Sequence, residues 1–147
     1  MTDIAFHFNV SEPIGYTLRL LRKAYRSGAQ VVVFGDAPVV NALDGLMWSS
    51  EATEFLPHCL AQSASTACLA ASPVVLVNDM QTNSFYQDVL VNLQRRMPPS
   101  FAQFARVIEI VSLEEADRLA ARERWRFYAS RGYSMSRHEA RTAIKSA

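Results

Sequence analysis

Short segments in which every residue is apolar limit this chain to a few folds. Val31–Phe34 (Val-Val-Val-Phe) and Val74–Val77 (Val-Val-Leu-Val) are the two clearest. A strand made only of apolar residues must be covered on both faces, as happens in a parallel sheet that carries helices on each side. We therefore expect these two segments to be interior strands of a mostly parallel sheet.

Segments of helical and of strand-like periodicity alternate around these two strands. This alternation predicts one Rossmann-like α/β domain over residues 1–134, with a mostly parallel sheet of about five strands and helices on both faces. We expect residues 135–147 to form a polar, basic C-terminal tail. The predicted helices run from Pro13 to Gly28, Asp36 to Trp48 and Leu113 to Ser130. The further predicted strands are Ile4–Val10, Val89–Leu93 and Arg106–Val111. The segment Trp48–Gln62 is expected to be irregular.

Such a fold often belongs to a nucleotide-binding enzyme, but the chain lacks the motifs of that class. Its five glycines are too far apart for a Gly-x-Gly-x-x-Gly loop, and it has no Gly-Lys-Ser/Thr element. No serine lies in a nucleophile elbow. We expect no nucleotide cofactor, no nucleotide-binding loop and no catalytic site. The alternative is a nucleotide- or small-molecule-binding enzyme, whose ligand would lie at the strand ends near Gly35 and Asp79.

The remaining candidate ligands and thiols point to no metal or disulfide. His7, His58 and His138 fall on three distant segments, and none has a second ligand at metal-binding spacing. Cys59 and Cys68 match no zinc or redox motif, so two reduced structural thiols are the simpler interpretation. No apolar run approaches the roughly 20 residues of a membrane span, and the first ten residues do not resemble a signal peptide. We expect a cytoplasmic protein without a metal.

The charge of the chain is unevenly distributed. No Lys or Arg occurs from Ser27 to Gln94, whereas from Arg118 onward eight basic residues face two acidic ones, a net charge of +6. The residues before Arg118 carry seven basic and twelve acidic side chains, a net charge of −5. A basic end on an acidic body attracts anionic partners.

This basic end coincides with the last predicted helix. On a helical wheel Trp125 falls nearly opposite the expected core, with Arg122 and Arg126 one turn apart beside it. Exposed aromatics ringed by arginine are typical of binding hot spots, although a charged helix face is often only solvated. With only two lysines in the chain, the pattern favours an acidic peptide with an apolar end over nucleic acid as the ligand.

The buried face of the same helix is expected to be an apolar stripe of Ala116, Leu119, Ala120 and Phe127. Glu123 lies in the middle of this stripe, and we expect it to pair with a neighbouring arginine.

Several motifs, in order and spacing, resemble those of the chi subunit family of bacterial DNA polymerase III. The two most specific are Phe-x-Pro-His at residues 55–58 and Ala-Arg-Glu-Arg-Trp-Arg at residues 121–126. The resemblance covers most of the chain. The other motifs that carry it are Phe6-His7-Phe8, Ala24–Gly28, Leu43-Asp44 with Trp48, Ser72-Pro73-Val74, Asp88–Leu93 and Gly132-Tyr133.

The resemblance implies a non-catalytic accessory subunit of the clamp-loader complex in DNA replication. Members of the family bridge the psi subunit to the C-terminal tail of single-stranded DNA-binding protein (SSB), and contact nucleic acid mainly through SSB. That tail is acidic and ends in a hydrophobic residue with a free carboxylate. Arg122, Trp125 and Arg126 match the family's tail-binding set, with Arg118, Arg124 and Tyr128 as secondary candidates. For psi, the resemblance indicates Trp48 and Phe55, although the residues alone favour a place in the core for both.

Overall fold

The computed structural model of the chain describes residues 2–49, 57–60, 72–78, 88–98 and 101–140. Three helices and seven strands are present in these ranges. The expected sites at Phe55, Cys68 and Asp79 lie outside the described residues. The elements are β1 (Asp3–Val10), α1 (Pro13–Arg26), β2 (Val31–Phe34), α2 (Ala37–Ser49), β3 (His58–Leu60), β4 (Val74–Val77), β5 (Val89–Asn92), the 3-10 turn η3 (Phe101–Gln103), β6 (Arg106–Ser112), α4 (Glu115–Ser130) and β7 (Ser134–Glu139).

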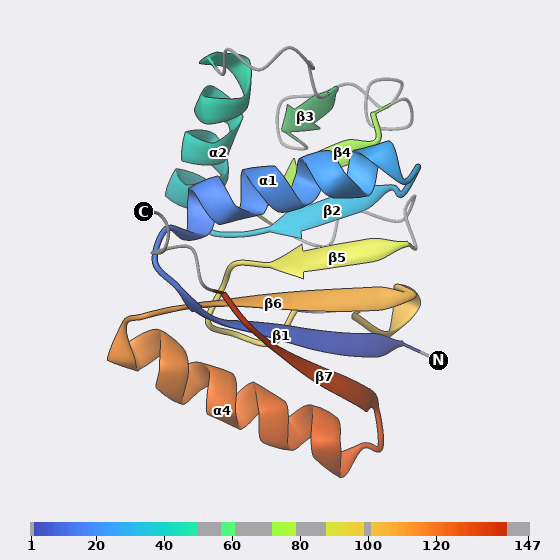
Figure 1. Cartoon of the computed structure of the whole chain (residues 1–147), viewed down its shortest axis with the longest axis vertical. Coiled ribbons are helices and arrows are strands. Elements are labelled where there is room, and N and C mark those ends of the chain that lie inside the picture. Colours follow the sequence, from blue (N-terminus) through green and yellow to red (C-terminus); the bar gives the residue numbers. More distant parts are fainter. Residues whose placement is uncertain (1, 50–56, 61–71, 79–87, 99–100, 141–147) are drawn as a thin grey trace.

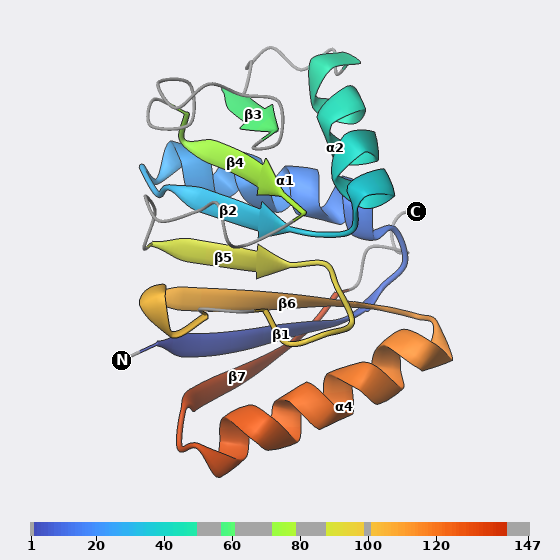
Figure 2. The same cartoon turned by 180° about the vertical axis from the view of Figure 1, so that it is seen from behind.

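The seven strands form one open sheet in which every pairing is parallel. Their order is β3-β4-β2-β5-β6-β1-β7. Helix α1 lies on the face of the sheet that is turned to the viewer in Figure 1, and Figure 2 shows the sheet from the other side. Both all-apolar strands, β2 and β4, are buried along their whole length. The predicted α/β class and the mostly parallel sheet are therefore confirmed.

The sheet has a core on each face. Leu18 and Leu21 of α1 and Leu43 of α2 pack on one face. Ala121 and Tyr128 of α4 pack on the other face, against a cluster that contains residues of β1, β2, β4 and β6. Strand β1 contributes Ile4 and Phe6 to one core and Val10 to the other, because its pairing with β6 shifts register between His7 and Val10. Helix α4 thus lies over one end of the sheet, next to β1 and β7 (Figure 1).

Two strands were not expected from the sequence. Strand β3 is only three residues long and lies in the segment expected to be irregular. Strand β7 begins where the domain was expected to end, and it pairs with β1 from Asp3↔Ser134 to Phe8↔Glu139. Because β7 is an edge strand with mostly exposed polar residues, it has no apolar pattern. The ordered sheet therefore extends to Glu139, and the first residues of the expected tail belong to it.

Within the described ranges, no helix combines the length and the apolar character that crossing a bilayer requires.

Candidate functional site

A small hollow opens between the end of β1, the exposed face of α4 and the edge strand β7. We call it the basic pocket. Four of its lining side chains are arginines and none is a carboxylate. Such a lining favours an anionic ligand that also carries an apolar group. The pocket has a volume of about 260 Å³ and is lined by Phe8, Asn9, Arg118, Arg122, Trp125, Arg126 and Arg137.

The indole of Trp125 forms the apolar part of the basic pocket together with Phe8. Its ring centroid lies 5.2 Å from that of Phe6 and 6.4 Å from that of Phe8. These contacts hold the indole against the sheet and bury it partly. The sequence predicted an exposed Trp125, which is correct only in part: the ring packs on β1 and the residue still lines the pocket.

The four arginines of the pocket differ in how they are held. The Arg137 guanidinium lies 4.7 Å from the centroid of the Phe8 ring, a cation–π contact. Arg126 Nη1 donates to Glu123 Oε2 at 2.8 Å, and both side chains are largely exposed, so the expected pairing of Glu123 is confirmed. Arg118 and Arg122 have no carboxylate partner in the described part of the chain. At least these two remain available to a ligand.

The face of α4 that packs on the sheet is not the one that the helical wheel predicted. The buried residues are Ala121, Arg124 and Tyr128, whereas Leu119 is 50% exposed. The reason lies in the sheet, because the fully buried Glu109 of β6 needs a charged partner from the helix that covers it. The predicted core stripe is therefore correct only for Phe127, which packs partly buried against the core. Ala116 and Leu119 are exposed, and Ala120 is half-buried.

The carboxylate of Glu109 accepts three side-chain hydrogen bonds. Arg124 Nε and Asn92 Nδ2 donate to Oε1 at 2.9 and 2.7 Å, and the Tyr128 hydroxyl donates to Oε2 at 2.7 Å. Burial raises the pKa of Glu109, while Arg124 and the other two donors oppose that rise. Because all three groups donate, the arrangement suits the ionised carboxylate. Arg124 and Tyr128, both secondary candidates for tail binding, therefore point inward and do not line the basic pocket.

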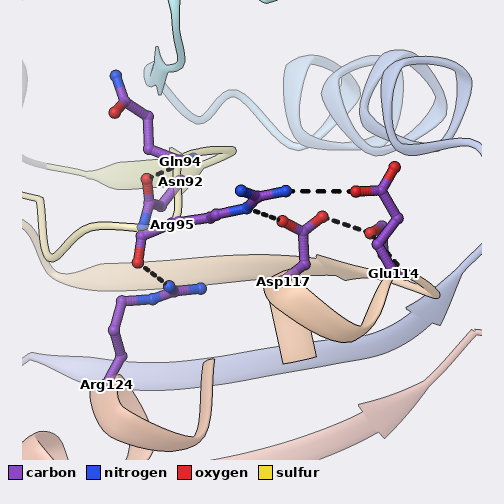
Figure 3. Close-up of polar contacts among 7 residues, drawn as sticks. Asn92, Gln94, Arg95, Glu114, Asp117 and Arg124 are labelled. Atoms are coloured by element: carbon purple, nitrogen blue, oxygen red, sulfur yellow. Dashed lines mark hydrogen bonds and ion pairs between the residues drawn. The ribbon is translucent and has the colours of Figure 1, made fainter. Parts of the chain in front are cut away.

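The loop after β5 ties the start of α4 to the same network (Figure 3). Arg124 donates to the backbone carbonyl of Arg95. The Arg95 side chain in turn pairs with Asp117 at 2.5 Å and with Glu114 at 3.3 Å. Partial burial acts to raise the pKa of Asp117, but hydrogen bonds from Ser112 and Arg95 and the Arg95 charge hold it below its ordinary value. Helix α4 is thus fixed at its start and its middle, which sets the direction of its basic face.

Trp48, indicated for psi binding, lies far from the basic pocket. It belongs to the last turn of α2 and is 62% exposed. Its ring lies 5.1 Å from that of His58, whose Nε2 lies 3.0 Å from Asp44 Oδ1. Helix α2 is next to β3, at the end of the sheet opposite to β7 and α4 (Figure 1). The structure therefore separates Trp48 from Trp125 by the width of the sheet.

Gly35 and two of the histidines, all singled out by the sequence, have surroundings that the sequence did not predict. A Cβ at Gly35 would meet the side chains of Val39 and Val40 at 3.4 Å, so this glycine faces packed side chains. His7 and His138, far apart in the sequence, are neighbours on adjacent strands with ring centroids 4.8 Å apart. No group of three or more His, Cys, Asp or Glu side chains suited to a metal ion was found among the described residues.

Comparison with known proteins identifies the family to which this chain belongs. The profile of the family described as "DNA polymerase III chi subunit, HolC" matches residues 1–136. DNA polymerase III subunit chi of Pseudomonas aeruginosa is 38% identical over 122 residues, which cover 82% of this chain and 81% of the relative. The chi subunit of Haemophilus influenzae is 26% identical over 118 residues, which cover 80% of this chain and 80% of the relative. That of Escherichia coli is 26% identical over 113 residues, which cover 76% of this chain and 75% of the relative. With its parallel α/β fold, the chain belongs to the chi subunit family of DNA polymerase III.

Proposed function

We propose that this chain is a non-catalytic accessory subunit that links the clamp loader of DNA polymerase III to SSB, and that the basic pocket receives the C-terminal tail of SSB. The observation that carries the proposal is the convergence of four arginines on Trp125 and Phe8. A peptide that is acidic and ends in an apolar residue with a free carboxylate matches this lining in charge and in polarity.

The two chemical parts of the pocket have separate roles in this proposal. The last apolar side chain of the tail packs against Trp125 and Phe8, whose positions are fixed by ring contacts. Arg122 and Arg118, which have no carboxylate partner among the described residues, bind the terminal carboxylate and the preceding acidic side chains. Arg126 can join them by exchanging Glu123 for a carboxylate of the ligand.

We further propose that the psi subunit binds around Trp48. This exposed indole and the neighbouring Leu46, which is 37% exposed, give α2 an apolar surface of the kind found at subunit interfaces. Phe55 completes this proposed surface by resemblance alone. Because α2 and α4 lie at opposite ends of the sheet, the two partners would not compete for space. This separation is what a bridging subunit needs.

Titration with a synthetic SSB tail peptide tests the pocket. We expect binding in the micromolar range that weakens as the salt concentration rises, because the contacts are mostly exposed ion pairs. A peptide without its terminal residue should bind at least about tenfold more weakly, since it loses the group that packs on Trp125. Equal binding of the two peptides, or tighter binding of bare single-stranded DNA than of the tail, would contradict the proposal.

Removing the carboxylate of Glu123 should strengthen tail binding. The variant Glu123→Gln frees Arg126 from an exposed pair, worth about 0.3–0.5 kcal/mol, so we expect about twofold tighter binding in a fluorescence anisotropy titration. The matched control is Glu115→Gln, which makes the same charge change on α4 outside the pocket lining. An equal gain in both variants would mean that net charge, and not release of Arg126, is responsible.

A further inference from the structure

A second hollow lies on the opposite face of the sheet, between α1 and strands β5, β6, β1 and β7. We call it the α1 cavity. Its volume is about 560 Å³, which is within the range of roughly 300–1,000 Å³ that small-molecule sites occupy. The cavity shares no lining residue with the basic pocket.

The floor and the roof of the α1 cavity are apolar. Val91 and Ile108 from neighbouring strands form part of the floor, and Leu20 and Ala24 of α1 lie on the other side. Leu20 and Ala24 are one helical turn apart, and Tyr16 lies one turn before them, so one stripe of α1 faces the cavity. An apolar ligand body of small size fits between these two surfaces.

The charged groups of the α1 cavity are all cationic. Arg19 and Lys23 of α1 and Arg106 of β6 line it, and no Asp or Glu does so. At one end the Arg19 guanidinium lies 5.9 Å from the centroid of the Tyr16 ring, and the Tyr16 hydroxyl is hydrogen-bonded to His7 Nδ1. The three cations come from two elements and line one concave surface, where a negative charge would be stabilised.

The pKa of His7 reflects both its burial and the cations that line the α1 cavity. Its pKa is lowered to about 4, by burial first and then by His138, Arg106 and Lys23. The imidazole is therefore neutral at pH 7, because the cavity disfavours an additional proton. Burial would also oppose a bound anion, but the positive charges of Arg106 and Lys23 would favour it.

We propose that the α1 cavity binds a small organic anion, with an apolar body between α1 and the sheet and a carboxylate or phosphate group bound by Arg19, Lys23 and Arg106. This site is independent of the proposed binding of the SSB tail. Side chains of β1 and β7 alternate between the two hollows: His7 and His138 line the α1 cavity, while Phe8 and Arg137 line the basic pocket. Each hollow can therefore be tested while the other is left intact.

Three probes of similar size separate charge from apolar contact: 4-phenylbutyrate, phenyl phosphate and the neutral 4-phenylbutyramide. Binding to the full chain is followed by the NMR signals of the imidazole rings, of which the chain has only three. We expect the anions to shift the signals of His7 and His138, while His58 on β3 stays unchanged as an internal control. The amide should bind about tenfold more weakly than the matching carboxylate, since it lacks a charge-assisted contact. The tighter anion identifies the preferred headgroup.

Two charge reversals locate the bound anion. Arg106→Glu should weaken 4-phenylbutyrate binding about tenfold or more, because a cation of the cavity becomes an anion. Arg122→Glu makes the same change in the basic pocket and should leave this binding unaltered. The proposal is overturned if His7 and His138 do not respond to either anion, if the amide binds as tightly as the carboxylate, or if Arg122→Glu removes the binding and Arg106→Glu does not.

Discussion

Replacing Glu109 with glutamine is expected to lower the free energy of unfolding by about 3–5 kcal/mol, the largest effect of any single substitution considered for this protein. The variant leaves the guanidinium of Arg124, which is only 4% exposed, without a balancing charge. It also replaces one carboxylate oxygen with an amide NH2 group, which cannot accept a hydrogen bond. A loss of this size is a large share of the 5–15 kcal/mol by which domains are normally stable. Chemical denaturation followed by circular dichroism measures it.

Two controls separate the lost charge from other causes. Glu115→Gln makes the same chemical change at an exposed position of α4, and should alter the unfolding free energy by less than about 0.5 kcal/mol. The double variant Glu109→Leu with Arg124→Met removes both charges, and should be more stable than Glu109→Gln because no buried ion is left unpaired. A loss below about 1 kcal/mol in Glu109→Gln would mean that Arg124 finds another partner or water.

The second large effect is expected for Arg122→Glu, which should weaken binding of the SSB tail peptide by roughly 30- to 150-fold. Arg122 lines the basic pocket and has no carboxylate partner in the described residues, so the change removes one contact and adds repulsion. Because the side chain is exposed, the unfolding free energy should stay the same. Isothermal titration calorimetry with the tail peptide gives the affinity.

The matched control for this variant is Arg131→Glu, an equal charge reversal just after α4 and outside the pocket lining. It should reduce affinity only through long-range attraction, and the reduction should disappear at high salt. Similar losses in both variants at high salt would refute the assignment of the pocket. Trp125→Ala is a poorer test, because the indole also packs on Phe6 and Phe8 and its loss would destabilise the domain.

Helices and strands could be predicted from the sequence where the local pattern of apolar residues matches the faces that are buried in the fold. Strands β2 and β4 are all-apolar and central, and each of the three helices begins and ends within a few residues of its predicted bounds. Strands β3 and β7 could not be predicted, because one is very short and the other is polar and lies at an edge. Their existence depends on pairing with distant segments, which no local window contains.

The candidate site could be predicted only as far as it lies on one helix. Arg122, Trp125 and Arg126 are close in sequence, and the structure brings them to one hollow. Phe8 and Arg137 were missed because they reach it through the pairing of β1 with β7. The orientation of α4 was mispredicted because helical-wheel analysis assigns every arginine to solvent, and only the buried Glu109 reverses that assignment for Arg124.

The last strand has a consequence for how the protein tolerates shortening. Strand β7 has β1 as its single neighbour and supplies one residue, Arg137, to the basic pocket and the next, His138, to the α1 cavity. A frameshift or a protease cut shortly before Ser134 would leave both central all-apolar strands with their neighbours and all three helices in place. It would nevertheless remove Arg137 from the basic pocket and His138 from the α1 cavity together. We therefore expect a folded product that binds neither of the two proposed anions.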